Sequence, residues 1–128
     1  MPESSPRALF AARLAQARQL RGLSQRALGD RMGLGKEKGS SRINRYEHQV
    51  TAIGFDNLNT LAQVLDVPVA YLLADDASMA DAILAFSQAD EAQREVLTKL
   101  IPAVLQDPSM LSKLVELLQV PNGSDTGE

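Results

Sequence analysis

The sequence lacks cysteine and tryptophan, and it holds only two tyrosines and three phenylalanines. Without cysteine, the 128-residue chain can form neither a disulfide scaffold nor a thiolate zinc site, which fits a reducing compartment. No apolar run approaches the roughly 18 residues of a membrane span. Arg7 and Arg13 interrupt the stretch where a signal peptide needs apolar residues. We therefore expect a cytoplasmic protein with one main domain, an aliphatic core and a small appendage.

Charge is distributed unevenly along the chain. Residues 1–53 carry ten Lys/Arg against four Asp/Glu, a net charge of +6, and residues 54–128 carry three against twelve, a net charge of −9. A basic first part joined to an acidic second part indicates that the first part meets a polyanion such as nucleic acid. The alternative is an uneven distribution of charge over a surface that only meets solvent.

Helical periodicity predicts an all-α fold, and no convincing alternating strand is present. The first part of the chain contains five helical segments, at residues 7–22, 24–33, 40–49, 54–67 and 68–75. Gly22 and Gly33 are expected to close the first two helices, and Ser24 to cap the second. Ser40 or Ser41 is expected to cap the third. We expect residues 1–74 to form one domain.

The chain after residue 75 is acidic and contains amphipathic segments at 78–88, 91–100 and 108–119. Asp90 with Gln93 forms a capping-box pattern, Pro102 is expected to break or kink the helix that follows, and Pro121 to end the last helix. We expect residues 75–120 to be a helical oligomerisation region and residues 121–128 a disordered tail. The apolar faces of this region predict the contacts of a homodimer: Met79, Ile83, Phe86, Leu97, Leu100, Ile101, Leu111, Leu114, Val115 and Leu118.

The segment "GLGKEKGSSRINRYEHQ", residues 33–49, is rich in glycine and in basic side chains. It could hold the phosphate of a small molecule or face the phosphates of a nucleic acid. Its glycines do not match the spacing of a P-loop or of a Gly-x-Gly-x-x-Gly motif, and the preceding segment is helical rather than a strand. The nucleic-acid alternative is therefore favoured.

A helical wheel of the third segment separates two faces. Ile43, Tyr46 and Glu47 share the inward face, while the opposite face collects polar side chains that can hydrogen-bond to base edges. Lys36 and Lys38 can reach phosphates from the preceding loop, and the start of the second helix also favours a phosphate. The expected DNA contacts are Ser24, Gln25, Lys36, Lys38, Ser40, Ser41, Arg42, Asn44, Arg45 and His48. A solvated charged face, or a helix C-terminal role for the histidine, remains the alternative.

The stretches "ARQLRGLSQRALGDRMG", "INRYE" and "LNTLAQVLDVPVAYLLAD" together resemble the Cro/C1-type (XRE-like, lambda-repressor-like) helix-turn-helix regulators. The resemblance covers about residues 7–74. It implies a five-helix DNA-binding domain, an Arg18–Glu47 ion pair, a phosphate contact by Gln25, and base reading by the first turns of the third helix. One departure is the turn from Gly33 to Ser40, which is about four residues longer than usual.

The predicted function is that of a sequence-specific regulator of transcription, a repressor that binds a palindromic operator in double-stranded DNA as a homodimer. The recognition helix is expected at about residues 40–48, with no cofactor or metal, in a cytoplasmic, nucleoid-associated protein. The alternative is an antitoxin-like or co-regulator module whose acidic C-terminal helices bind a protein partner. An enzyme is disfavoured, because the single histidine lies in the DNA-facing helix.

Overall fold

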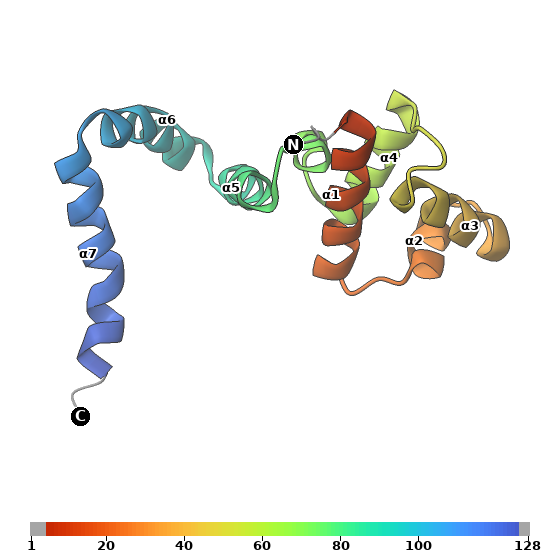
Figure 1. Ribbon diagram of the computed structural model, residues 1–128, viewed down its shortest axis with the longest axis horizontal. Helices are drawn as coiled ribbons and strands as arrows, with labels where there is room; N and C mark the ends of the chain where they lie inside the picture. The colour runs from red at the N-terminus through yellow and green to blue at the C-terminus, as the bar shows by residue number, and fades with distance from the viewer. Residues whose placement is uncertain (1–4, 126–128) are drawn as a thin grey trace. The chain divides into compact units, whose positions relative to one another are not determined.

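The computed structural model describes residues 5–125, apart from the side chains of residues 36, 37 and 120–125. Within this range it contains seven α-helices, one 3-10 helix (η1) and no strand (Figure 1), so the all-α prediction is confirmed. The elements are α1 (Pro6–Leu20), α2 (Gln25–Arg31), α3 (Lys36–Glu47), α4 (Phe55–Leu65), η1 (Val69–Leu73), α5 (Ala77–Gln88), α6 (Glu91–Gln106) and α7 (Pro108–Asp125). The chain divides into two compact units between Gln88 and Ala89.

Short polar residues and glycines set the ends of the first helices. Ser5 caps α1 by accepting a hydrogen bond from the Ala8 amide, and Ser24 caps α2 by accepting one from Ala27 at 3.0 Å. Gly22 and Gly33 follow the two helices with φ of +68° and +81°, a backbone conformation that side chains with a Cβ rarely adopt. The Ser24 cap and the two closing glycines agree with the sequence prediction, which named no cap for α1.

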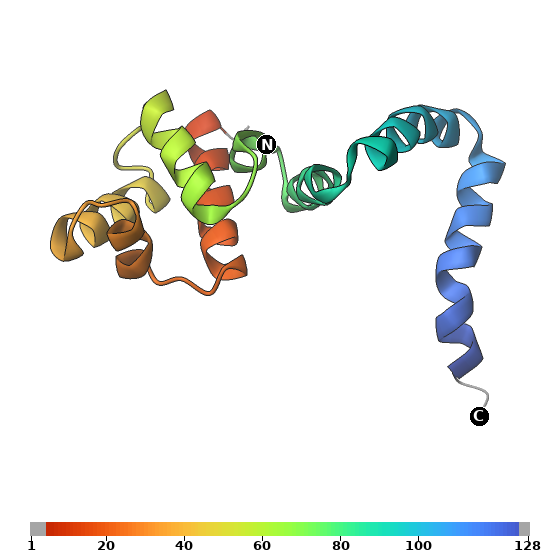
Figure 2. The same ribbon diagram turned by 180° about the vertical axis from the view of Figure 1, so that it is seen from behind.

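The core of the first unit is built around α1. Figures 1 and 2 show α1, α4 and the α2–α3 pair grouped together in this unit. The largest fully buried side chains come from all of these elements and from η1: Leu14, Leu28, Ile43, Leu61, Leu65, Tyr71 and Leu72. Phe10 and Tyr46 also meet edge to face, with ring centroids 5.9 Å apart. This aliphatic core fixes α3 to the rest of the unit through its inward face.

Helix α3 begins at Lys36, four residues earlier than the sequence predicted. Its N-cap is Gly35, which offers no side chain to cap the helix, and Gly39 lies inside the helix. Gly39 is tolerated there because α2 and α3 nearly touch: a Cβ added to Gly29 would lie 2.4 Å from the Gly39 carbonyl carbon. The predicted long turn and the predicted cap at Ser40 or Ser41 are therefore wrong.

Helix α5 is part of the first unit, although the sequence predicted that the first domain ends at residue 74. Ala80 is fully buried in the core of that unit, and Ile83 and Leu84 pack against it. The Gln16 side-chain amide also donates to Asp81 Oδ1 at 3.2 Å. Ile83, predicted as a dimer contact, is thus partly covered by its own chain, because one apolar face of α5 completes the core.

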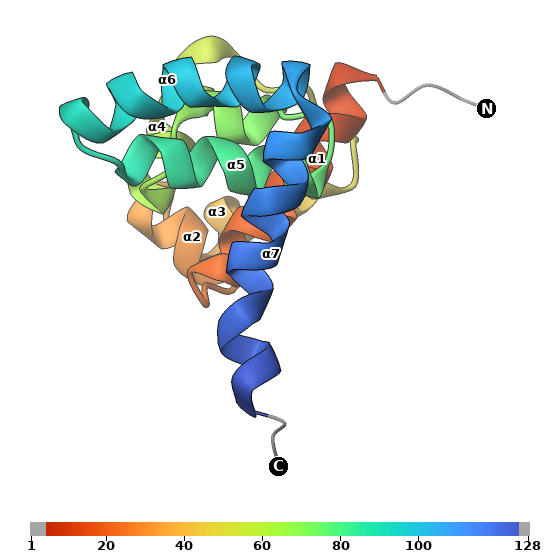
Figure 3. The same ribbon diagram turned by 90° about the vertical axis from the view of Figure 1, so that its left-hand side faces the viewer.

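The second unit contains α6 and α7, two consecutive helices that meet at a corner (Figure 3). The capping box is confirmed, since Asp90 Oδ1 accepts from the Gln93 amide at 2.8 Å and Gln93 Oε1 accepts from the Asp90 amide at 2.9 Å. Asp107 separates the helices and accepts a hydrogen bond from the Ser109 hydroxyl at 2.7 Å. This hydrogen bond lowers the pKa of the Asp107 carboxyl.

Pro102 does not break its helix, and Pro121 does not end its helix, although the sequence predicted that Pro121 would. Pro102 lies inside α6, which continues to Gln106, and α7 passes Pro121 and continues to Asp125. A proline removes one backbone donor, and at Pro102 the good helix formers Leu100 and Ala103 carry the helix past it. The predicted disordered tail therefore starts too early, and residues 126–128 lie outside the described range.

Candidate nucleic-acid interface

The outward face of α3 carries the polar side chains that the sequence assigned to it. Ile43 and Tyr46 are buried on the inward face, whereas Ser41, Asn44 and Arg45 are exposed. The inward direction follows from packing against α1 and α2, so this core also determines which side chains of α3 face solvent.

Four side chains line one hollow of about 410 Å³ on this face: Lys38, Ser41, Arg42 and Arg45. Their positions are separated by three, one and three residues, so they lie along one side of a helix. Lys38 therefore lies on the same helical face as Arg45, and not in a loop before the helix as the sequence predicted. Three cationic groups and one hydroxyl converge there, which is the chemistry that holds phosphates and guanine edges.

A nearly buried ion pair holds the C-terminal end of α3 against α1. Arg18 Nε donates to Glu47 Oε2 at 2.7 Å, and Arg18 Nη2 donates to Glu47 Oε1 at 3.1 Å. The hydrogen bond to Glu47 raises the pKa of the Arg18 guanidinium. Arg18 Nη1 also donates to the Leu23 carbonyl at 2.9 Å, so the same guanidinium fixes the entry to α2. The pair implied by the resemblance is present.

Glu47 also begins a chain of hydrogen bonds that reaches the exposed face. Gln25 Nε2 donates to Glu47 Oε1 at 3.0 Å, and Gln25 Oε1 accepts from Asn44 Nδ2 at 3.3 Å. The Gln25 amide is therefore held between the nearly buried Glu47 carboxylate and Asn44 on the outward face of α3. The sequence prediction missed this link, because it assigned Gln25 only to a phosphate.

Comparisons with known proteins agree with this geometry. The helix-turn-helix family profile matches residues 14–72. A solved structure, that of the transcriptional regulator BswR, is 33% identical to this chain; the match covers 75% of this chain and 95% of that one, with a TM-score of 0.68. The chain belongs to the helix-turn-helix family of the Cro/C1 type. A search of curated proteins found no significant match.

In this helix-turn-helix domain, α2 and α3 occupy the place of the motif, and α3 is the helix that the sequence predicted as the recognition helix. Its described range, residues 36–47, replaces the predicted range of about 40–48. Lys36 begins the helix, Ser40 is half-buried within it, and the Ser24 hydroxyl is engaged in capping α2. The predicted site residues from Lys38 to Arg45 are thereby gathered on one helix.

His48 follows α3 as its C-cap. Its Nδ1 lies 2.9 Å from the Asn44 carbonyl oxygen, and the ring is exposed. If Nδ1 carries the proton, the ring donates to a carbonyl of the last turn that also accepts from the His48 backbone amide at 3.0 Å. This contact fits the helix C-terminal role that the sequence left as an alternative for His48.

Other kinds of site find little support in the part of the chain that the structure describes. Between residues 5 and 125, no group of three or more His, Asp or Glu side chains is placed to hold a metal ion. No helix in that range is both long and apolar enough to span a bilayer. The outward face of α3 is therefore the strongest candidate site.

Proposed function

We propose that the chain is a DNA-binding regulator of transcription that reads double-stranded DNA with the outward face of α3. The observation that carries the proposal is the convergence of Lys38, Ser41, Arg42 and Arg45 on one side of a helix whose other side is buried. A helix with such a face fits the major groove, where arginine recognises guanine and lysine reaches phosphates. The net charge of +6 on residues 1–53 supports the same polyanionic partner.

The proposal extends to a homodimeric repressor on a palindromic operator, and the second unit supports the dimer. In the described part of α6 and α7, Val104 is the one buried apolar side chain. Both helices leave apolar side chains exposed, among them Ile101, Leu105 and Leu118. Closed twofold pairing is the commonest way to cover such faces, and it matches half-sites about 34 Å apart. The cytoplasmic, nucleoid-associated location belongs to this proposal.

The second candidate is an antitoxin-like or co-regulator module. The same exposed apolar faces favour it, because they lie in a part of the chain with a net charge of −9 and could cover a basic protein surface. The two candidates differ in what occupies α6 and α7: a second copy of the chain or a different protein. The mass of the purified protein in solution separates them.

The DNA interface is tested by two substitutions in the full-length chain. Arg45→Ala should cost about 1–3 kcal/mol on the preferred sequence and relax the preference at one base position. Lys38→Ala should weaken binding to all sequences alike and reduce the slope of log K against log salt by about 1. Fluorescence anisotropy with labelled duplexes across a salt series measures both.

The matched control is Lys113→Ala, which removes an exposed positive charge from α7. We expect its affinity and salt slope to equal those of the unchanged protein. Binding that is insensitive to salt, or equal losses for Lys38→Ala and Lys113→Ala, would show that α3 does not face the phosphates.

A further inference from the structure

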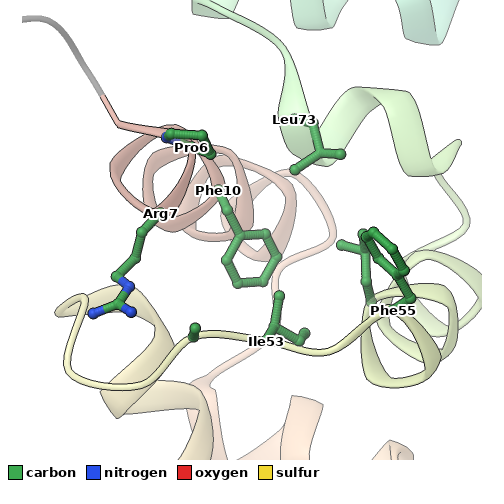
Figure 4. A pocket seen from close by; sticks show the side chains of 8 residues that line it. Pro6, Arg7, Phe10, Ile53, Phe55 and Leu73 are labelled. Carbon is green, nitrogen blue, oxygen red and sulfur yellow. The ribbon is translucent and has the colours of Figure 1, made fainter.

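Phe55 is the most exposed large apolar side chain among those described in the first unit. It is the first residue of α4 and is 86% exposed. Phe55 is also one wall of an apolar hollow of about 270 Å³, which is lined by the buried side chains of Phe10 and Leu58 and by Ile53 and Leu73. Figure 4 shows Arg7 on one side of this hollow and Phe55 on the other.

Neither feature is explained by the fold of a single chain. A phenylalanine left in water gains none of the roughly 2–3 kcal/mol that its burial would contribute. A cavity of about 150 Å³ already admits benzene, so a hollow of about 270 Å³ has room for one aromatic ring. One face of the unit thus carries a protruding ring and, beside it, a hollow of a size that admits such a ring.

We propose that this face is a contact between two copies of the chain, in which Phe55 of each copy enters the hollow of the other. A surface that carries a projection and a matching hollow is complementary to itself, and a twofold axis between the two satisfies both at once. A different partner would need only one of these features. The proposal does not depend on DNA binding.

Charge supports the same arrangement. Asp56 follows Phe55 directly and is exposed. Arg7 lines the hollow and donates a long hydrogen bond, 3.4 Å, to the Gln49 carbonyl. When the ring of one copy enters the hollow of the other, the adjacent carboxylate comes close to that arginine. The twofold axis produces this pair of opposite charges twice, at the rim of the contact.

The contact is small and therefore weak. A ring and a few neighbouring side chains cover much less than the 1,200–2,000 Å² or so of a stable interface. It forms when another interaction already holds two copies together and raises their effective concentration to about the millimolar range. The proposed pairing of α6 and α7 supplies such an interaction.

The position of the contact links it to the recognition helix. Ile53 lies in the loop after α3, where the Val50 amide donates to the Arg45 carbonyl at 2.8 Å. Phe10, at the base of the hollow, packs edge to face on Tyr46 of α3. Occupation of the hollow by a second copy would therefore favour one placement of the loop and of the C-terminal end of α3.

Crosslinking of the full-length chain tests the proposal without DNA. Because the chain has no cysteine, one cysteine at Ala52, an exposed residue at the hollow, gives a single reactive site and keeps Phe55 intact. Ala12, an exposed alanine on α1, gives the matched control. With a short bismaleimide, the Ala52→Cys variant should form a covalent dimer at least about tenfold faster than the Ala12→Cys variant. Adding Phe55→Glu should remove that advantage, whereas adding Leu20→Glu, at another exposed apolar residue, should not.

A charge exchange then identifies the occupant. Arg7→Glu and Asp56→Arg should each slow the crosslinking of Ala52→Cys. The double exchange should restore it, because the opposite charges are restored across the contact only when both partners are copies of the same chain. Thermal unfolding confirms that each variant is folded. Equal rates for Ala52→Cys and Ala12→Cys, or equal effects of Phe55→Glu and Leu20→Glu, would overturn the proposal. A loss of DNA binding in another assay would leave this result unchanged.

Discussion

Two glycines set the distance between the helices of the motif. Gly29 and Gly39 face each other so closely that a Cβ on Gly39 would lie 2.7 Å from the Gly29 Cα. Here the backbones themselves are in contact, and no flexible side chain can move aside. The helix-turn-helix geometry therefore depends on the absence of a side chain at both positions.

Gly39→Ala should destabilise the protein, although alanine is the better helix former by about 1 kcal/mol. Overpacking of two helix backbones costs about 1–3 kcal/mol, so we expect a net loss of stability in urea unfolding. Ser41→Ala, on the exposed side of the same helix, is the control and should stabilise the protein by a few tenths of a kcal/mol. A Gly39→Ala variant as stable as the Ser41→Ala variant would contradict the close contact.

Some side-chain contacts of the site could be predicted from the sequence, and others could not. The Arg18–Glu47 pair followed from the resemblance, and the inward direction of Ile43 and Tyr46 followed from helical spacing. The Gln25 link to Glu47 and Asn44 did not, because it depends on how α2 crosses α3. Residues 22 and 19 positions apart carry no local signal of such a contact.

At the scale of elements, helix type was predictable and several helix ends were not. The starts of α2 and α6 were predicted correctly because Ser24 and Asp90 cap them. The start of α3 was placed too late, because Gly35 gives no capping signal and Gly39 disfavours helix locally. The close contact between α2 and α3 outweighs the low helix propensity of Gly39. Such a tertiary contact cannot be inferred from the residues that neighbour Gly39 in the sequence.

Helix α5 gives a prediction about where the first unit ends. A chain that stops at Asp76 loses Ala80, Ile83 and Leu84 from the core, whereas one that stops at Gln88 keeps them. Each apolar side chain removed from such a site costs about 1–3 kcal/mol. In thermal unfolding, the chain that ends at residue 76 should therefore melt well below the chain that ends at residue 88. Equal melting temperatures would show that α5 is not part of this core.

At the scale of the whole molecule, the second unit is predicted to hold two chains together. Leu118 is 76% exposed, and the apolar faces of α6 and α7 have few internal partners among the described residues. The full-length chain should therefore be a dimer in sedimentation analysis. The chain that ends at Gln88 should be a monomer at micromolar concentration, because the Phe55 face alone is too small to hold a pair. A monomeric full-length chain would refute the assignment.

Dimerisation and DNA reading are predicted to act together. One helix-turn-helix domain makes few base contacts, so two domains on one palindrome are needed for both affinity and specificity. The acidic residues after position 54 disfavour contact between the second part of the chain and DNA, which leaves the basic first part to dock. This division of roles predicts that loss of the second unit weakens DNA binding even though α3 is intact.

The most direct measurement of the central claim is selection of bound sequences from a random pool of duplex DNA with the full-length protein. Base reading by two copies of α3 predicts an enriched motif of two inverted half-sites whose centres are about one helical turn, roughly 10 base pairs, or a multiple of it apart. That motif should lose one base preference when the selection is repeated with Arg45→Ala. A pool that remains random after several rounds, while the protein stays folded, would contradict sequence-specific reading by α3.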